Sequence, residues 1–228
     1  MPSLPQKPSL ALFIALMLVS LAFAVVRSAK TQSVERHQSQ ESDPLVAAVR
    51  KGGLREAARI KGHYVSTERT TGWMKYDLES LTQNSPDVII GTPIVSSSNL
   101  VGSGDRIVTE YSIRIDQTLK GKLNEKRLVT LEVPRGKVTF DDGTSAEIKT
   151  PDLGPIEEHH SYLMFLRPRG SGSEVFGLTG SGQGLFELSA SDSMVKPRGD
   201  SADTVQKYKD QRISDFIEEV KIAVKRYP

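Results

Sequence analysis

The stretch that decides the fold is Arg106–Leu119, RIVTEYSIRIDQTL. Successive side chains of an extended chain point to opposite faces, so a period of two marks a strand with one face in a core. The apolar residues of this stretch alternate with polar ones: Ile107, Tyr111, Ile113 and Ile115 against Glu110, Ser112, Arg114 and Asp116. The pattern therefore predicts a β-strand that is half buried and half in solvent.

Further strands are predicted on both sides of this one. A hairpin is indicated by the turn Asp141-Asp142-Gly143, and the glycine-rich stretch 180–183 is interpreted as a second hairpin turn between its two flanking strands. The other predicted strands are Val88–Val95, interrupted at Pro93, then Leu128–Val133, Lys137–Phe140, Ala146–Lys149, Ser161–Leu166, Glu174–Leu178 and Gly184–Leu188. We expect a mainly β protein with flanking helices (α+β), built on a small antiparallel barrel of five to seven strands.

Helical patterns occur only outside this β region. Asp43-Pro44 is typical of a helix start, and Gly52-Gly53 is expected to break this helical segment into two short helices. Trp73–Leu81 predicts another turn or two of helix. Near the C-terminus, one apolar stripe predicts an amphipathic helix that packs on the barrel: Ile213, Phe216, Ile217, Val220 and Val224.

The N-terminal segment is apolar. Leu10–Val26 contains one polar residue, Ser20, and as a helix would span about 25 Å. Lys7 precedes it, and Ala22-Phe23-Ala24 has the small-x-small form of a signal-peptide cleavage site. We predict either a cleaved signal peptide or a retained membrane anchor. Both place the folded part outside the cytoplasm, in the periplasm, secreted, or tethered by a single transmembrane helix.

Five segments are expected along the chain. The stretch after the apolar segment is polar and has no periodicity, which is typical of a flexible linker. The segments are 1–26 (signal peptide or membrane anchor), 27–43 (flexible tether), 44–85 (short helical region), 86–196 (β-barrel domain) and 197–228 (C-terminal helix packing on the barrel).

Composition narrows the possible functions. The chain has no cysteine, which excludes disulfides, thiolate zinc sites and cysteine nucleophiles. Lys and Arg together number 30 against 28 Asp and Glu, a balance that disfavours nucleic acid as a partner. We expect no cofactor. The expected partners are an unknown macromolecule at the cell envelope and, if the N-terminal segment is retained, the membrane.

Several motifs of the β region together resemble a known group of proteins. They are Asp87-Val-Ile-Ile-Gly-Thr92, Tyr111-Ser-Ile-Arg-Ile115, Leu119-Lys-Gly121, Val129-Thr-Leu-Glu-Val-Pro-Arg-Gly136, Tyr162-Leu-Met-Phe-Leu166 and Gly182-Gln-Gly-Leu-Phe186. Over roughly residues 86–190 the chain resembles uncharacterised exported bacterial proteins with an OB-like β-barrel. More distantly it is similar to the netrin-like module of tissue inhibitors of metalloproteinases. The resemblance implies an OB-like barrel. Those inhibitors chelate the zinc of their target through an N-terminal cysteine, which this chain lacks.

One polar cluster has residue types that bind metals, Glu157-Glu158-His159-His160. Neighbouring residues on an extended segment point to opposite faces, so His159 and His160 are not expected to join the same site. A metal-assisted hydrolase using one of them is the alternative function. An exposed loop leading into the strand at Tyr162 is the simpler interpretation.

Other motifs give weaker signals. Gly180-x-Gly-x-Gly184 lies between two strands, whereas a dinucleotide-binding loop lies between a strand and a helix. Asp141-Asp142-Gly143 lacks the alternating oxygen ligands of a calcium loop. The chain contains no Gly-x-Ser-x-Gly elbow of a serine hydrolase.

Two groups of side chains are candidate recognition surfaces. Arg135, Lys137, Arg167 and Arg169 lie near predicted strand ends and form either a patch facing an anion or membrane, or ordinary solvated loop charge. Tyr64, Trp73 and Tyr76 form either an aromatic patch or the core of the helical region. The function predicted is a non-enzymatic, extracytoplasmic binding or envelope-associated module. An inhibitor-like protein-binding domain is a further alternative.

Overall fold

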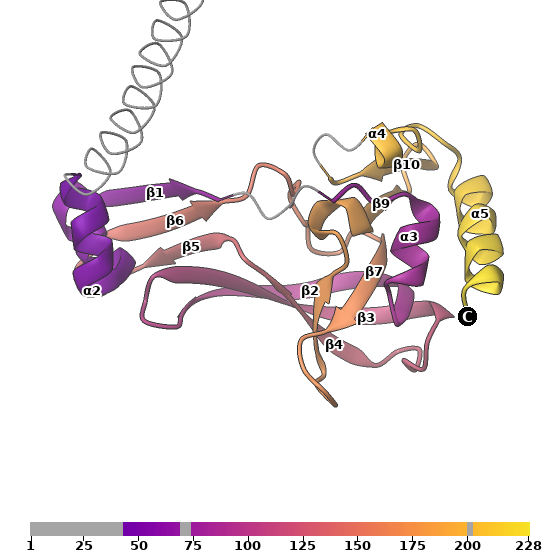
Figure 1. Ribbon diagram of the computed structural model, residues 1–228, viewed down its shortest axis with the longest axis horizontal. Helices are drawn as coiled ribbons and strands as arrows, with labels where there is room; N and C mark the ends of the chain where they lie inside the picture. Colours follow the sequence, from indigo (N-terminus) through magenta and orange to yellow (C-terminus); the bar gives the residue numbers. More distant parts are fainter. Residues whose placement is uncertain (1–42, 69–73, 200–202) are drawn as a thin grey trace, which may run out of the picture. The chain divides into compact units, whose positions relative to one another are not determined.

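The computed structural model describes residues 43–68, 74–199 and 203–228 (Figure 1). It divides into two compact units, with Lys51 ending the first and Gly52 beginning the second. The apolar segment 1–26 and the tether up to residue 42 lie outside the described residues. Within the described ranges, no helix is both long and apolar enough to cross a membrane.

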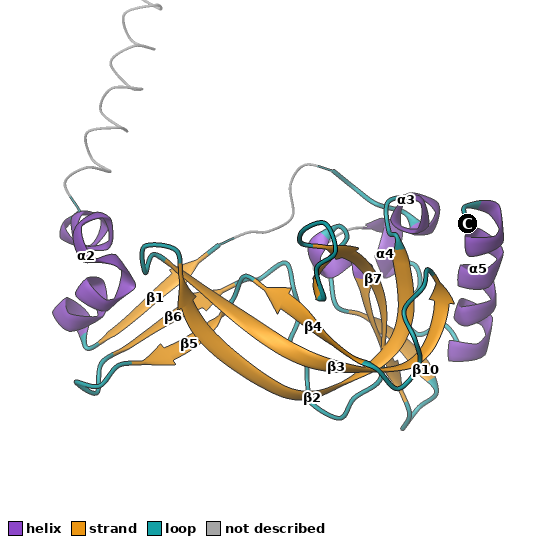
Figure 2. Cartoon of the chain, turned by 90° about the horizontal axis from the view of Figure 1, so that it is seen from below, coloured by secondary structure: helices purple, strands orange, loops and turns teal. Residues whose placement is uncertain are grey.

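Five strands of the second unit close into a barrel. Going round it, each strand pairs with the next and the fifth with the first: β2 (Asp87–Val101), β3 (Arg106–Lys120), β4 (Leu128–Val133), β8 (Val175–Leu178) and β7 (Tyr162–Pro168). Figure 2 shows β2, β3, β4 and β7 curling around a common interior. A small five-stranded barrel with this crossed order is of the OB type. The α+β fold class with a small OB-like barrel is therefore confirmed.

One pair in the barrel is parallel, although the sequence predicts antiparallel strands throughout. Thr130 pairs with Val175 and Leu131 with Phe176 in the parallel pair β4–β8, whereas the other four pairs are antiparallel. A closed ring with an odd number of strands cannot alternate direction at every step. Closure with five strands therefore requires a parallel pair.

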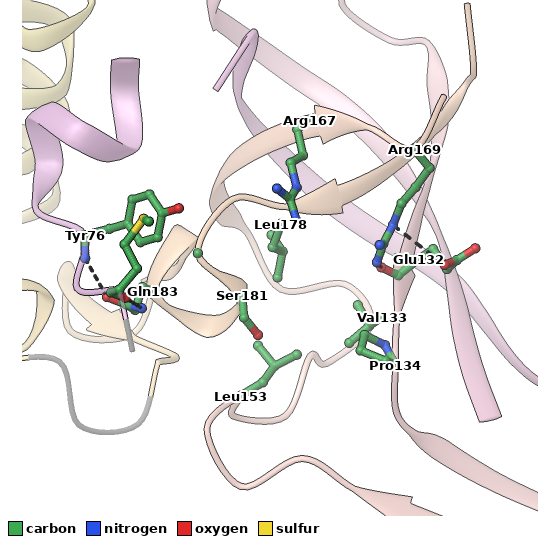
Figure 3. A pocket seen from close by; sticks show the side chains of 12 residues that line it. Tyr76, Glu132, Val133, Pro134, Leu153, Arg167, Arg169, Leu178, Ser181 and Gln183 are labelled. Atoms are coloured by element: carbon green, nitrogen blue, oxygen red, sulfur yellow. Dashed lines mark hydrogen bonds and ion pairs between the residues drawn. The ribbon is translucent and has the colours of Figure 1, made fainter. Parts of the chain in front are cut away.

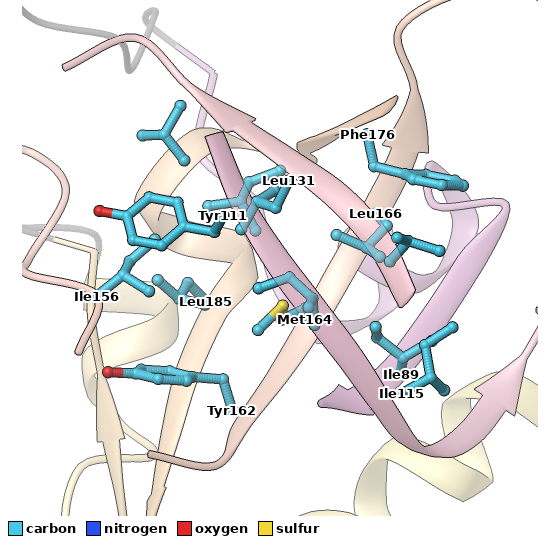
Figure 4. Packing of buried hydrophobic residues seen from close by; sticks show 14 of the residues in the cluster. Ile89, Tyr111, Ile115, Leu131, Ile156, Tyr162, Met164, Leu166, Phe176 and Leu185 are labelled. Atoms are coloured by element: carbon cyan, nitrogen blue, oxygen red, sulfur yellow. The ribbon is translucent and has the colours of Figure 1, made fainter. Parts of the chain in front are cut away.

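The first half of β2 and most of β7 are buried on both faces. Ile89 of β2 and Met164 of β7 point into the barrel, whereas Val88 and Phe165 point into a second core outside it. Figure 4 shows the inner cluster, to which Tyr111, Leu131 and Leu185 also belong. Burial on both sides explains why these strands are continuous apolar runs in the sequence, while β3 alternates.

The outer core is covered by helices. Helix α5 (Ile213–Arg226) buries Phe216, Val220 and Ala223 in it, and helix α3 (Leu78–Gln83) adds Leu78 and Leu81. The predicted apolar stripe of the C-terminal helix is confirmed at Phe216 and Val220. A short helix, α4 (Asp203–Gln206), precedes α5.

Helix starts and breaks follow local chemistry. Helix α2 (Pro44–Lys61) begins at the predicted residue, where the Leu45 amide donates to Asp43 Oδ1 at 2.8 Å. Its backbone leaves the helical region at Gly52 and Gly53, as predicted. Asp77 and Ser80 form a reciprocal capping box at the start of α3. The residues from Met74 to Asp77, predicted as helix, are not helical.

A three-stranded sheet contains the predicted hairpin and one strand that was not expected. β5 (Gly136–Thr139) and β6 (Ser145–Lys149) are antiparallel and flank the turn at 141–143. The strand β1 (His63–Thr67) adds in parallel to β6. The stretch 44–85, predicted as a short helical region, therefore also contains a strand. Its backbone partners come from β6, about eighty residues later, and the local sequence pattern does not indicate them.

Two predictions in the β region are wrong. The strand predicted at Val88–Val95 is not interrupted at Pro93, because β2 continues through a register shift beside Pro93 as far as Val101. Proline is tolerated there because the pairing of β2 with β7 ends at Gly91, so no partner needs the missing amide.

The second error concerns the predicted hairpin around residues 180–183. This stretch forms a short 3-10 helix, η1 (Ser181–Gly184), and β8 does not pair with β9 (Leu185–Ser189). Instead β9 pairs with β7 and with β10 (Met194–Pro197), a strand that the sequence did not predict. Turn residues indicate where the chain changes direction, but they do not indicate with which strand the following segment pairs.

Candidate functional site

A cavity of about 330 Å³ lies at the ends of β4, β7 and β8. Polar and charged side chains from separate parts of the chain, among them Glu132, Arg167 and Gln183, share its lining with apolar groups. Its volume lies at the lower end of the ~300–1,000 Å³ usual for small-molecule sites. The full lining is Met74, Tyr76, Glu132, Val133, Pro134, Leu153, Arg167, Arg169, Leu178, Gly180, Ser181 and Gln183.

Gln183 holds one wall of this cavity in place. Its side-chain Oε1 accepts a hydrogen bond from the Tyr76 amide at 2.9 Å, and its Nε2 donates to the Met74 carbonyl at 3.3 Å. Gln183 itself is buried, with 4% of its surface exposed. The Tyr76 ring lies over Gly180, where a Cβ would come within 2.9 Å of it. The amide of one buried glutamine thus fixes the segment that presents Tyr76 to the cavity (Figure 3).

Replacing Gln183 with leucine should make the segment 74–76 less firmly held against the barrel. Leucine has a similar volume but leaves the Tyr76 amide and the Met74 carbonyl without their partners, and each lost hydrogen bond costs about 0.5–1.5 kcal/mol. We expect the free energy of unfolding to fall by about 1–3 kcal/mol, as measured by urea titration. Amide exchange at residues 74–76 should also become faster. The matched control is Gln117→Leu, an exposed glutamine in β3. Unchanged exchange at 74–76 would contradict this role.

Arg169 crosses β8 to reach β4. Its Nε lies 3.7 Å from Glu132 Oε1, and its Nη2 donates to the Glu132 carbonyl at 3.3 Å. The side chain passes over Gly177, where a Cβ would stand 2.8 Å from Arg169 Nε. Glycine at this position therefore lets the arginine lie flat against the strand and keeps its charge beside Glu132.

Arg167 lies near the end of β7, two residues before Arg169, which directly follows that strand, but it has a different environment. It is exposed, and no ion pair or side-chain hydrogen bond joins it to any residue in the described parts of the chain. Figure 3 shows its guanidinium pointing from β7 toward Leu178, while Arg169 turns toward Glu132. Arg167 is thus the cation of this cavity whose charge is not already compensated by an acidic partner.

The four basic residues singled out in the sequence do not form one patch. Arg167 and Arg169 line the cavity together. Arg135 instead donates to the carbonyls of Leu153 and Gly154, both at 2.9 Å, and so braces a loop. Lys137 lies on β5, opposite Glu147. Half of the predicted patch therefore contributes to the site, because Arg167, near the end of β7, and Arg169, directly after it, both line the cavity.

The aromatic group predicted from the sequence is also divided. Tyr76 lines the cavity, whereas Tyr64 lies in β1 of the three-stranded sheet. Trp73 lies outside the described residues. Gln183 was not predicted as a site residue from the sequence. Its position between two glycines was the available signal, because a glutamine that becomes buried in such a loop can hold the loop in place through hydrogen bonds.

His159 and His160 diverge, as predicted, although the backbone at His159 forms a left-handed turn (φ 65°) rather than an extended segment. The amide of His159 donates to the Pro93 carbonyl at 2.8 Å and its side chain is exposed. His160 turns the other way, with Nδ1 2.9 Å from Glu187 Oε1 and Nε2 3.3 Å from Glu157 Oε2. Glu158 accepts a hydrogen bond from Ser96. Across the described ranges, no group of three or more histidine or acidic side chains is arranged to hold a metal ion.

His160 belongs instead to a charged cluster built around a buried acid. The side chain of Glu187 is 7% exposed and forms an ion pair with Arg198 in addition to its contact with His160. Arg198 is largely buried as well, with 19% of its side chain exposed. Glu187 lies in β9, Arg198 directly follows β10, and His160 lies in the segment before β7, so the cluster connects these three parts of the chain. The arrangement is that of a structural ion-pair network rather than an open site.

The remaining motifs have structural roles. Hydrogen bonds from the hydroxyl and the amide of Thr144, with Arg59 nearby, lower the pKa of Asp142 to about 2. Asp142 therefore stabilises the β5–β6 turn. The stretch 180–184 forms η1 and the floor of the cavity beside Tyr76. No protein-family model matches the chain, and no curated protein matches it.

Proposed function

We propose that this protein is a non-enzymatic, extracytoplasmic module that binds a small ligand, or a small chemical group of an envelope component, in the cavity beside β4, β7 and β8. The observation that carries the proposal is the cavity itself. Its wall is held by a buried glutamine, and it contains one arginine whose charge has no partner within the described residues. Sites of this kind combine apolar walls with a few fixed polar groups.

The proposed location rests on the sequence. Leu10–Val26 is an apolar segment of signal-peptide or anchor type, and a chain with no cysteine has no thiols to oxidise outside the cytoplasm. The proposed absence of catalysis rests on the character of the cavity. The described residues that line it include no histidine, and their one carboxylate, Glu132, is already paired with Arg169.

Native mass spectrometry of the full chain tests the proposal. The chain is purified in mild detergent from its own envelope fraction and compared with two variants. Met74→Trp places a large ring at the cavity wall, and Ile222→Trp makes the same change at an exposed site on α5 that does not line the cavity. Wild type and Ile222→Trp should carry a non-covalent adduct, and Met74→Trp should carry less of it or none.

Two results would contradict the proposal. One is an adduct that is absent from the wild type or equally abundant in Met74→Trp. The other is a folded part that protease added to intact spheroplasts cannot reach, since the proposal places that part outside the cytoplasm.

A further inference from the structure

We infer that the ligand is a small organic monocarboxylate, whose carboxylate pairs with Arg167 and whose apolar body lies against Tyr76 and Leu178. This inference rests on the proposed function of the cavity and goes further by naming the chemical class. Three features support it. Arg167 has no acidic partner among the described residues, the described lining of the cavity has a net positive charge, and apolar surface lies beside Arg167.

Arg167 supplies the recognition of an anion. A guanidinium presents parallel N–H donors that match the two oxygens of a carboxylate. Arg167 points toward Leu178 and has no acidic partner among the described residues, so its donors are available on the cavity side (Figure 3). Arg169 is not available in the same way, because it lies across Gly177 and contacts Glu132.

The charge of the lining selects a monoanion. Among the described residues that line the cavity, two arginines and one glutamate give a net charge of +1. Glu132 holds Arg169 and would also repel a second negative charge on a ligand near it. A phosphate monoester carries nearly two negative charges at neutral pH and would leave one of them uncompensated. A single carboxylate would neutralise the net charge of the described lining.

The rest of the lining favours an apolar body of limited size. Tyr76, Leu178 and Val133 contribute carbon surface, as do Met74, Pro134 and Leu153. At ~30 Å³ for each water-sized group, a volume of about 330 Å³ holds roughly ten such groups. The Tyr76 ring, fixed over Gly180, offers a surface on which an aromatic ring can pack edge to face or offset.

Three probes of similar size separate the contributions of charge and shape. The acid 3-phenylpropanoate carries one carboxylate and an aromatic ring, the alcohol 3-phenylpropanol lacks the charge, and phenyl phosphate carries nearly two charges. Isothermal titration of the full chain should give a ranking with the carboxylate tightest. The alcohol should bind at least about tenfold more weakly, which is the scale of one good charged contact.

Substitutions test Arg167 directly. Arg167→Met should weaken binding of 3-phenylpropanoate at least about tenfold while leaving the alcohol nearly unchanged, and Arg167→Lys should recover part of the loss. Arg212→Met is the matched control, because Arg212 is also an exposed arginine without an ion pair in the described residues, but it lies before α5 and outside the cavity. Its binding should equal that of the wild type.

The outcomes distinguish this inference from the proposed function. Tighter binding of phenyl phosphate, equal binding of the alcohol, or an unchanged affinity in Arg167→Met would overturn the monocarboxylate inference. So would failure of the wild type to bind any of the three probes. In each of these cases an envelope adduct that Met74→Trp abolishes would still support the cavity as a binding site. Loss of that adduct as well would overturn both.

Discussion

Replacing Glu187 with leucine is expected to lower the free energy of unfolding by about 3–5 kcal/mol, the usual cost of removing one partner from a buried ion pair. Glu187 is almost fully buried and is the shared acidic partner of Arg198 and His160. Without it, the guanidinium of Arg198 remains largely buried with no carboxylate beside it. Arg198 Nε already has no hydrogen-bond partner in the described structure, so little is available to compensate.

Two comparisons show whether the loss of stability comes from the buried ion pair: a double variant that removes both partners, and a variant of an exposed ion pair. Glu187→Leu combined with Arg198→Leu should recover much of the loss, because a buried ion pair replaced by apolar side chains is often neutral in stability. Glu174→Leu removes the partner of Arg127 in a pair whose side chains are 69% and 43% exposed. That change should cost no more than about 1 kcal/mol. Urea titration followed by circular dichroism measures all three variants. If Glu187→Leu costs no more than Glu174→Leu, the buried network does not have the proposed role.

Phe216→Ala is expected to cost about 3–5 kcal/mol, as truncation of a fully buried aromatic side chain usually does. The ring of Phe216 is fully buried, with centroids 4.8 Å from Phe186 and 5.0 Å from Tyr208. It therefore connects α5 to β9 and to the segment before the helix. Removing it leaves a cavity between the helix and the outer face of the barrel sheet, where the surrounding strands cannot easily move inward.

The exposed residue Ile222 is the control on the same helix. Its side chain is 51% exposed, so Ile222→Ala should change the stability by no more than about 0.5 kcal/mol. Phe216→Leu retains most of the apolar volume and should lie between the two. Thermal and urea unfolding of the full chain in mild detergent measure the series. Equal destabilisation by the Phe216 and Ile222 alanine variants would show that α5 does not depend on this contact.

The elements that the sequence predicted most accurately are those whose pattern lies within a single segment of the chain. β3 and β4 appear within one residue of their predicted bounds, because the period of two and the single wet face lie within each strand. The hairpin at 141–143 and the stripe of α5 are of the same kind, since a turn and an amphipathic helix each carry their own pattern.

The elements that were missed depend on partners far along the chain. β1 exists through its parallel pairing with β6, and β9 turned out to pair with β7 and β10 rather than with β8. β2 passes Pro93 because its other neighbour has already ended at Gly91. In each case a non-local hydrogen-bonding partner decided the outcome, and the local pattern does not contain that information.

The sequence by itself determined the α+β class, the small barrel, the main strands and the C-terminal helix. Only the tertiary structure decided that five strands close with one parallel pair, and that Gln183 and Tyr76, more than a hundred residues apart, form one wall of a cavity. It also decided that Arg169 is compensated by Glu132 while Arg167 is not. The physical reason is that periodicity reports which face of a segment is buried, whereas a site depends on which segments closure of the barrel brings together.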